Sequence, residues 1–121
     1  MNILLTNDDG YSAPGILTLY DRLRQDHEVV LIAPDRERSA VGHGITLNEP
    51  LRIEPIERGE KDTVYAINGT PADCVKLGLF DICTSPPDLV ISGINPGSNT
   101  GININYSGTV AAAREAAFNR I

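Results

Sequence analysis

Short, mainly apolar segments alternate with polar turns along the first third of the chain. NILLT (residues 2–6) and EVVLIA (residues 28–33) are runs of the kind that form buried strands. Between them the apolar positions keep the helical spacing i, i+3, i+4, i+7: Ile16, Leu19, Tyr20 and Leu23. This helix is expected to begin near Pro14, with Ser12 as a candidate cap. Strand, helix and strand together have the length of a βαβ unit, whose right-handed crossover makes the two strands parallel.

The middle of the chain has a more broken pattern. Residues 45–67 contain short extended pieces on either side of the charged turn ERGEKD, which predicts a hairpin or a similar excursion. A helix is then expected from Thr70 to about Phe80. Threonine is a good cap, proline suits the first helical position, and Asp73 stands at the third position.

Two further elements complete the predicted fold. DLVISG (residues 88–93) predicts a third buried strand, and TVAAAREAAF (residues 109–118) predicts a last helix after an uncharged loop. This order predicts a three-layer α/β/α domain with a Rossmann-like, mostly parallel sheet, in which about three core strands are parallel. Such a fold normally begins another strand where this chain reaches Ile121. Residues 1–121 are therefore expected to be the N-terminal part of a longer domain, truncated at its C-terminus.

Composition narrows the classes of function. The 121 residues are 41% hydrophobic, which is enough for one domain with a core. A net charge of -6 argues against a duplex nucleic-acid partner, but it is compatible with a small phosphorylated ligand held with a metal. No apolar run is long enough for a membrane span or a signal peptide, which predicts a cytoplasmic protein. Cys74 and Cys83 lack metal or redox spacing and are expected to be free thiols.

Three polar loops follow the carboxyl ends of the expected strands: NDDG, PDRERSA and GINPGSN. Open parallel sheets bind ligands at this edge, so the fold is expected to bring the loops together. They carry four oxygen donors: Asp8, Asp9, Ser39 and Asn95. Hard oxygen ligands favour Mg²⁺, Mn²⁺ or Ca²⁺ over Zn²⁺, and a cation would relieve the repulsion between the two adjacent carboxylates. A surface turn is the alternative explanation of the Asp-Asp-Gly sequence.

The uncharged loop GINPGSNTGININYSGT has a regular pattern of small polar residues. Glycines recur every four residues, and asparagines are interleaved at the same spacing: Asn95, Asn99 and Asn103. The loop ends in Ser107, Gly108 and Thr109 at the start of the last helix, where free N–H groups can bind an anion. Phosphate binding is therefore expected at these three residues and at Asn95 and Asn99. A flexible loop with an ordinary helix cap is the alternative, and the ending does not match a Walker loop.

Other polar residues follow the second expected strand. His43 could reach the same edge of the sheet, but loop histidines are more often solvated or hydrogen-bonded, so no acid role is assigned to it. Arg36 and Arg38 could approach a phosphate, although charged loop residues are usually solvated.

Five stretches, in this order, resemble the survival protein E (SurE) family: ILLTNDDG, APDRERSAVG, NGTPADCV, SGINPGSN and YSGTVAAAREA. The resemblance covers nearly the whole chain. It implies a divalent-metal-dependent phosphatase that hydrolyses nucleoside 5'- and 3'-monophosphates and, to some extent, short polyphosphate. It also implies one ion, Mg²⁺ or Mn²⁺ with Ca²⁺ possible in crystals, at Asp8, Asp9, Ser39 and Asn95. The phosphate-contacting stretch of the family corresponds to Ser107, Gly108 and Thr109.

The chain departs from the family pattern in two ways. Many members carry an aspartate at about the position of Ile102 or Asn103, and neither residue is acidic here. Family chains also continue further, and their later part supplies strands, oligomer contacts and a histidine proposed as proton donor. The resemblance thus implies a homodimer or a higher homo-oligomer, and an uncovered Phe118 in the last helix would favour self-association.

Two mechanisms stay open within the enzyme class. Asp8 or Asp9 could orient the attacking water or take its proton, or Asp8 could be a nucleophile that forms an aspartyl phosphate. A different class is also open, because a chain without the later part of the family could be a metal- and nucleotide-binding module without turnover.

Overall fold

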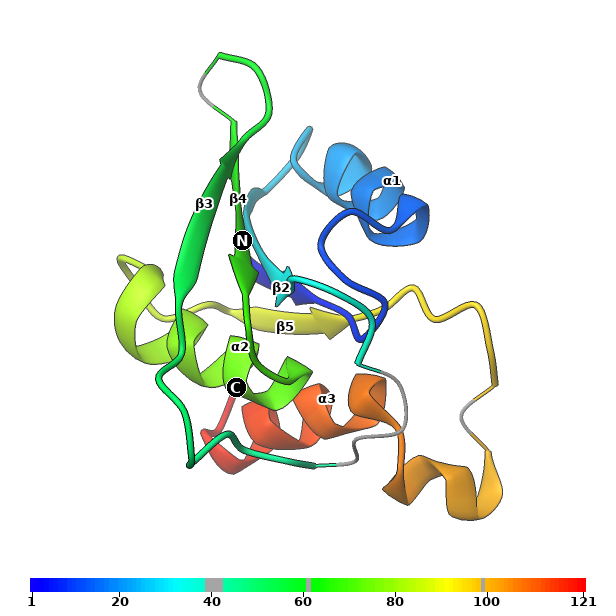
Figure 1. The fold of residues 1–121 in the computed structure, drawn as a ribbon. Helices are drawn as coiled ribbons and strands as arrows, with labels where there is room; N and C mark the ends of the chain where they lie inside the picture. Colours follow the sequence, from blue (N-terminus) through cyan, green and yellow to red (C-terminus); the bar gives the residue numbers. More distant parts are fainter. Residues whose placement is uncertain (39–42, 61, 99) are drawn as a thin grey trace.

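A single mixed sheet organises the fold (Figure 1). The computed structural model describes residues 1–38, 43–60, 62–98 and 100–121, and its five strands have the order β3-β4-β2-β1-β5. The strands are β1 (Asn2–Thr6), β2 (Glu28–Pro34), β3 (Ile53–Glu57), β4 (Thr63–Ile67) and β5 (Leu89–Ser92). β1 pairs in parallel with β2 and β5, β4 pairs in parallel with β2, and β3 is antiparallel to β4.

Helices cover both faces of the sheet. α1 (Pro14–Leu23) lies on one face, whereas α2 (Pro71–Leu77) and α3 (Gly108–Phe118) pack against each other on the other face (Figure 1). Two short turns complete the set: the π-helical η1 (Gly78–Ile82) extends α2, and the 3-10 turn η2 (Gly101–Asn105) precedes α3. The prediction of a three-layer α/β/α fold with a mostly parallel sheet is confirmed.

Each face of the sheet has its own hydrophobic core, because successive strand residues point to opposite faces. Leu4 and Ile32 pack toward α2 and α3, whereas Leu5 and Leu31 pack toward α1. All four side chains are fully buried. Burial of side chains of this size contributes about 1.5–3 kcal/mol each, so the two middle strands anchor both layers of helices.

The number of parallel strands differs from the expectation of about three. Residues 53–67 do form the expected hairpin, in which β3 pairs with β4 from Ile53–Ile67 to Glu57–Thr63. However, β4 also adds to β2 in parallel, from Ile32–Tyr65 to Pro34–Ile67, which makes four parallel strands. The sequence pattern missed this pairing because a hairpin can either lie apart from the main sheet or add a strand to it. Long-range packing decides which of these two arrangements forms, and the local sequence does not show it.

Two helix ends also differ from expectation. α1 begins at Pro14 as predicted, but its N-cap residue is Ala13 and no side chain caps it, so Ser12 is not the cap. A backbone hydrogen bond from Ala13 N to Gly10 O (3.2 Å) shapes the entry to the helix instead. α2 ends at Leu77 rather than near Phe80, because the hydrogen bonding widens into η1 from Gly78 onward.

The predicted cap of α2 is confirmed and does more than begin a helix. Thr70 Oγ1 accepts from Asp73 N (3.2 Å), and the Asp73 carboxylate accepts from Thr70 N (2.8 Å), which is a capping box. The same buried carboxylate accepts from Thr46 N (3.0 Å) and Thr46 Oγ1 (2.6 Å). Asp73 therefore ties the start of α2 to the segment that follows β2 along the chain.

The described residues include no helix that is long and apolar enough to cross a bilayer, and α3 has only 11 residues. Both cysteines are free thiols, as predicted. Burial raises the pKa of Cys74 and of Cys83, so both thiols stay protonated near neutral pH. Neither is suited to be a nucleophile.

Candidate active site at the carboxyl edge of the sheet

The turn after β1 places two carboxylates at the carboxyl edge of the sheet. Asn7 closes this turn, since its Oδ1 accepts from Gly10 N (3.1 Å) and its Nδ2 donates to Gly10 O (2.9 Å). Gly10 has a φ of 104°, a conformation that favours glycine. Because Asn7 and Gly10 close the turn, it does not require Asp8 and Asp9, and their presence calls for another explanation. The tendency of asparagine to bond its own backbone two or three residues on is the signal that could have singled out Asn7.

Asp8 faces the start of α3. Its side chain is buried, and Oδ1 accepts a hydrogen bond from Thr109 Oγ1 (3.1 Å). Gly108 lies against the same carboxylate, because a Cβ built on Gly108 would approach Asp8 Cβ to 2.9 Å. The structure thus brings one predicted metal ligand together with two of the predicted phosphate-binding residues.

The first turn of α3 presents two backbone N–H groups that are available to bind an anion. Ser107 is the N-cap: its Oγ accepts from Val110 N (3.2 Å), and its carbonyl accepts from Ala111 N (3.0 Å). The N–H groups of Gly108 and Thr109 have no acceptor within the part of the chain that the structure describes. Such groups at a helix N-terminus attract anions. The Ser107 hydroxyl oxygen already accepts the capping hydrogen bond from Val110 N. For the predicted contact with phosphate, the same hydroxyl would donate its proton to a phosphate oxygen.

The loop after β2 reaches the same edge through Arg38. Arg38 N donates to Asp8 O (2.7 Å), and its Nη2 donates to Asn68 O (3.1 Å) and lies 3.7 Å from Asp35 Oδ1. Arg38 is therefore not a solvated loop residue, since only 21% of its side chain is exposed. It fixes the loop after β2 to the turn after β1. Ser39, the predicted metal ligand beside it, lies outside the described residues.

The loop after β5 brings Asn95 to this edge. Gly93 N donates to Thr6 O (2.9 Å), which holds the start of the loop against β1. Asn95 is half-buried, and its Nδ2 donates to Gly97 O (2.8 Å), so the side-chain oxygen is directed away from that bond. Asn99, predicted to bind phosphate, lies outside the described residues.

Asp9 faces a pocket rather than α3. It lines a cavity of about 470 Å³ together with the start of α1 and with Ile94 and Pro96, the two neighbours of Asn95. Burial raises the pKa of the Asp9 carboxyl, and the negative charges of Asp8 and then Glu37 raise it further. The ionised form of Asp9 is therefore disfavoured in the folded chain.

This raised pKa predicts a gain in stability for Asp9→Asn. Because the folded pKa lies above the unfolded one, the penalty exists above the folded pKa and vanishes below the unfolded pKa. We expect Asp9→Asn to raise the free energy of unfolding of the metal-free protein near neutral pH by less than about 1 kcal/mol, since water screens half-exposed charges. The gain should shrink as the pH falls toward the ordinary aspartate pKa of about 3.9. Urea denaturation at several pH values measures this, and a loss of stability at neutral pH would contradict it.

His43 is engaged away from the Asp8 carboxylate. Its Nε2 lies 2.8 Å from Glu115 Oε2, and its ring packs near that of Phe118, with 5.6 Å between the centroids. Glu115 is a buried residue of α3 whose Oε1 lies 3.6 Å from Lys76 Nζ. His43 therefore anchors the segment after β2 onto α3, and of the two expected states, solvated or hydrogen-bonded, the structure shows the hydrogen-bonded one.

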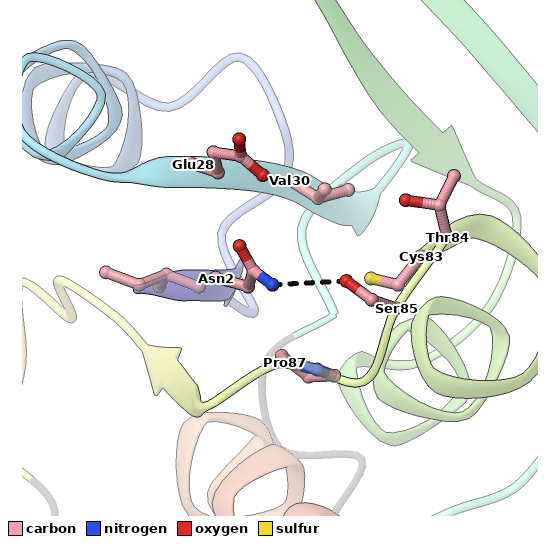
Figure 2. A pocket seen from close by; sticks show the side chains of 8 residues that line it. Asn2, Glu28, Val30, Cys83, Thr84, Ser85 and Pro87 are labelled. Carbon is pink, nitrogen blue, oxygen red and sulfur yellow. Dashed lines mark hydrogen bonds between the residues drawn. The ribbon is translucent and has the colours of Figure 1, made fainter.

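A smaller cavity lies at the opposite, amino edge of the strands (Figure 2). Asn2 and Glu28 border it, and Asn2 Nδ2 donates to Ser85 Oγ (3.1 Å) across its floor. Its volume of about 40 Å³ holds a water but no substrate. Cys83 also lines this cavity, and its raised pKa makes it a poor nucleophile. The carboxyl edge is therefore the candidate active site.

The fold and this edge define a class of protein: an α/β protein that presents an acidic pair after its first strand beside the N-terminus of a helix. Comparison with known proteins gives the family. The family model described as survival protein SurE matches residues 3–121, and the chain belongs to the SurE family.

Several curated relatives are named 5'-nucleotidase SurE. The chain is 59% identical over 117 residues to the protein of Desulfatibacillum aliphaticivorans and covers 46% of it. It is 56% identical over 117 residues to the protein of Kosmotoga olearia and again covers 46% of it; each match includes 97% of this chain. The crystal structure of the SurE protein from Aquifex aeolicus is similar with a TM-score of 0.85 and 48% identity, over 98% of this chain and 47% of that chain. The chain thus spans about half the length of the curated relatives it matches.

Proposed function

We propose that this chain forms the metal- and phosphate-binding part of a 5'-nucleotidase, which hydrolyses nucleoside 5'-monophosphates. The observation that carries the proposal is the contact between the buried Asp8 carboxylate and the first turn of α3, through Thr109 and Gly108. A group that attracts a cation and N–H groups that attract a phosphate are thereby neighbours. The names of the relatives favour an enzyme over a binding module without turnover.

Asp8 and Asp9 fit a divalent cation because neither carboxylate is paired with a cationic side chain among the described residues. The buried carboxylate of Asp62 pairs with Arg24 and Arg58, but none of the ion pairs between described residues includes Asp8 or Asp9. A buried carboxylate needs compensating positive charge or hydrogen bonds, and the one side-chain hydrogen bond of Asp8 recorded between described residues comes from a neutral hydroxyl.

The donor set indicates the kind of cation. No three described histidine, cysteine, aspartate or glutamate side chains form a cluster able to hold a metal. The further ligands would therefore be neutral oxygens, with Asn95 and Ser39 as our candidates, which favours one Mg²⁺ or Mn²⁺ ion and admits Ca²⁺. When bound, such an ion neutralises phosphate charge and lowers the pKa of a coordinated water.

The residues of the chain have separate tasks in this proposal. The free N–H groups of Gly108 and Thr109 hold phosphoryl oxygens and stabilise the charge that they carry during transfer. Thr109 Oγ1 fixes the orientation of the Asp8 carboxylate. Asp9, which faces the open pocket, has room to orient a water or to accept its proton. The loop with Asn95 and Asn99 adds neutral donors to the phosphate.

Hydrolysis of p-nitrophenyl phosphate with and without Mn²⁺ tests the proposal. We expect turnover that disappears with a chelator and returns with added Mn²⁺ or Mg²⁺. Absence of metal-dependent turnover, in a protein that still binds Mn²⁺, would favour the binding module. Release of phosphate from nucleoside 3'-monophosphates and from short polyphosphate, measured in the same way, tests the wider substrate range that we also infer.

Neutral ligands should matter less for the metal than the acidic one. We expect Asn95→Ala to weaken Mn²⁺ binding more mildly than Asp8→Asn, because a neutral amide attracts a cation less than a carboxylate does. Ser39→Ala should behave like Asn95→Ala. Calorimetric Mn²⁺ titrations of the three variants give the order, and equal or reversed losses would contradict the assignment.

Self-association is part of the proposal as well. Phe80 and Phe118 are 72% and 74% exposed, so each offers a large apolar side chain for contact with a second chain. We infer a homodimer or a higher homo-oligomer acting in the cytoplasm, which sedimentation and cell fractionation would test.

A further inference from the structure

The pocket beside Asp9 has apolar walls. It lies between the turn after β1, the first turn of α1 and the loop after β5, and it is lined by Asp9, Ala13, Pro14, Gly15, Ile94 and Pro96. Among these residues only Asp9 has a polar side chain. The volume of about 470 Å³ falls within the range of roughly 300–1,000 Å³ that is usual for small-molecule sites.

The pocket is placed to receive the part of a substrate next to its phosphate. In the turn after β1, Asp8 contacts Thr109 of α3, whereas the next residue, Asp9, lines the pocket at the start of α1. A phosphate at the N-terminus of α3 would therefore lie on one side of the acidic pair, with the apolar pocket on the other. Another cavity, of about 440 Å³, is bordered by charged residues that include Arg24, Glu28 and Asp62. It offers no such apolar walls.

We propose that the pocket lined by Pro14, Ile94 and Pro96 binds the nucleoside part of the substrate, with the base against these apolar side chains. This inference rests on the proposed function, which supplies the phosphate position. The faces of a base are flat and apolar, so they suit walls that offer contact area. Of the described lining residues, only Asp9 has a side chain that can hydrogen-bond to the edge of a base, so purine and pyrimidine nucleosides should both bind.

Ile94 is the side chain to change. It is 55% exposed, so its truncation removes pocket wall without opening the core. Its carbonyl oxygen would lie 3.3 Å from a Cβ built on Gly15, which places Ile94 directly against the start of α1. We expect Ile94→Ala to weaken the binding of adenosine and cytidine by about 5- to 10-fold, because apolar contact area is lost. Ile94→Leu keeps that area and should restore binding.

Titration of the 121-residue chain with adenosine, followed by amide NMR, measures this without metal or turnover. The amides of Gly15 and Ile94 should shift on titration, and Leu47→Ala, which truncates a side chain that is 87% exposed and outside the pocket, should bind normally. Unchanged adenosine binding in Ile94→Ala, or no binding at all, would overturn the inference.

Enzyme kinetics separate this inference from the proposed function. With AMP, Ile94→Ala should raise KM and leave kcat nearly unchanged, whereas with short polyphosphate, which has no base or other ring to contact the pocket, it should change neither by more than about twofold. Turnover of p-nitrophenyl phosphate together with unaltered AMP kinetics would overturn the pocket inference alone. Adenosine binding that depends on Ile94 in a protein without any phosphatase activity would support the pocket and overturn the proposed function.

Discussion

Asp8→Asn is expected to abolish metal-dependent phosphomonoester hydrolysis while the fold stays intact. Asparagine has the same shape, and its Oδ1 can still accept the hydrogen bond from Thr109 Oγ1. What it lacks is the negative charge that holds a cation at the end of β1. Loss of a group that stabilises transition-state charge lowers kcat by about 10²–10³-fold, and loss of the cation itself should cost at least as much. Initial rates with p-nitrophenyl phosphate at saturating Mn²⁺ measure the effect.

Asp81→Asn is the matched control for this variant. Asp81 is an exposed carboxylate on η1, outside the residues of the candidate site, so its removal changes the net charge equally and should leave activity intact. Circular dichroism and urea denaturation show whether Asp8→Asn is folded. Trapping with borohydride then separates the two mechanisms, since only an aspartyl phosphate on Asp8 would be reduced. Near-normal hydrolysis by Asp8→Asn would refute the assignment of Asp8 to the metal.

Gly108→Ala is expected to damage both stability and activity. The added Cβ would approach Asp8 Cβ to 2.9 Å and Pro71 Cγ to 3.2 Å, so the turn after β1 or the start of α3 has to move. Overpacking of this kind costs about 1–3 kcal/mol. Alanine is the better helix former by about 1 kcal/mol in a helix interior, so any net loss reports the close contact and not the helix. Because the contact is with Asp8, we expect kcat to fall as well.

Gly97→Ala is the comparison for this change. Among the described residues, a Cβ on Gly97 would meet only Asn95 Nδ2, at 3.8 Å, and Gly97 has no positive φ. The free energy of unfolding of this variant should therefore change by less than about 0.5 kcal/mol. Urea denaturation of both variants gives the difference, and phosphatase rates at equal folded fraction give the effect on catalysis. If Gly108→Ala matched the parent protein in both measurements, the close approach of α3 to Asp8 would have no functional importance.

Local patterns were enough to predict most elements of the fold. The strand over residues 2–6, the helix from Pro14 and the capping box at Thr70 follow from apolar spacing and from capping chemistry, which act over a few residues. The rule that parallel strands bind ligands at their carboxyl ends predicted which edge holds Asp8 and Asp9. These predictions needed no knowledge of which distant segments touch.

The contacts between distant segments had no such local signal. That β4 extends the sheet beside β2, that Arg38 N bonds to Asp8 O, and that His43 binds Glu115 all depend on packing across the chain. The sequence alone therefore does not distinguish a solvated Arg38 or His43 from one that is bound to a distant segment. Only the folded chain showed that both anchor the loop after β2.

The sequence by itself determined the chemical groups of this protein: an acidic pair after a buried strand, a glycine- and asparagine-rich loop, and a capped helix start. Only the tertiary structure decided which neighbours these groups have. Asp8 contacts Thr109, 101 positions away along the chain, and Asp9 lines an apolar pocket. The physical reason is that residue type and spacing fix local conformation and charge. The neighbours of a side chain across the sheet are set by how the two faces bury their apolar surface.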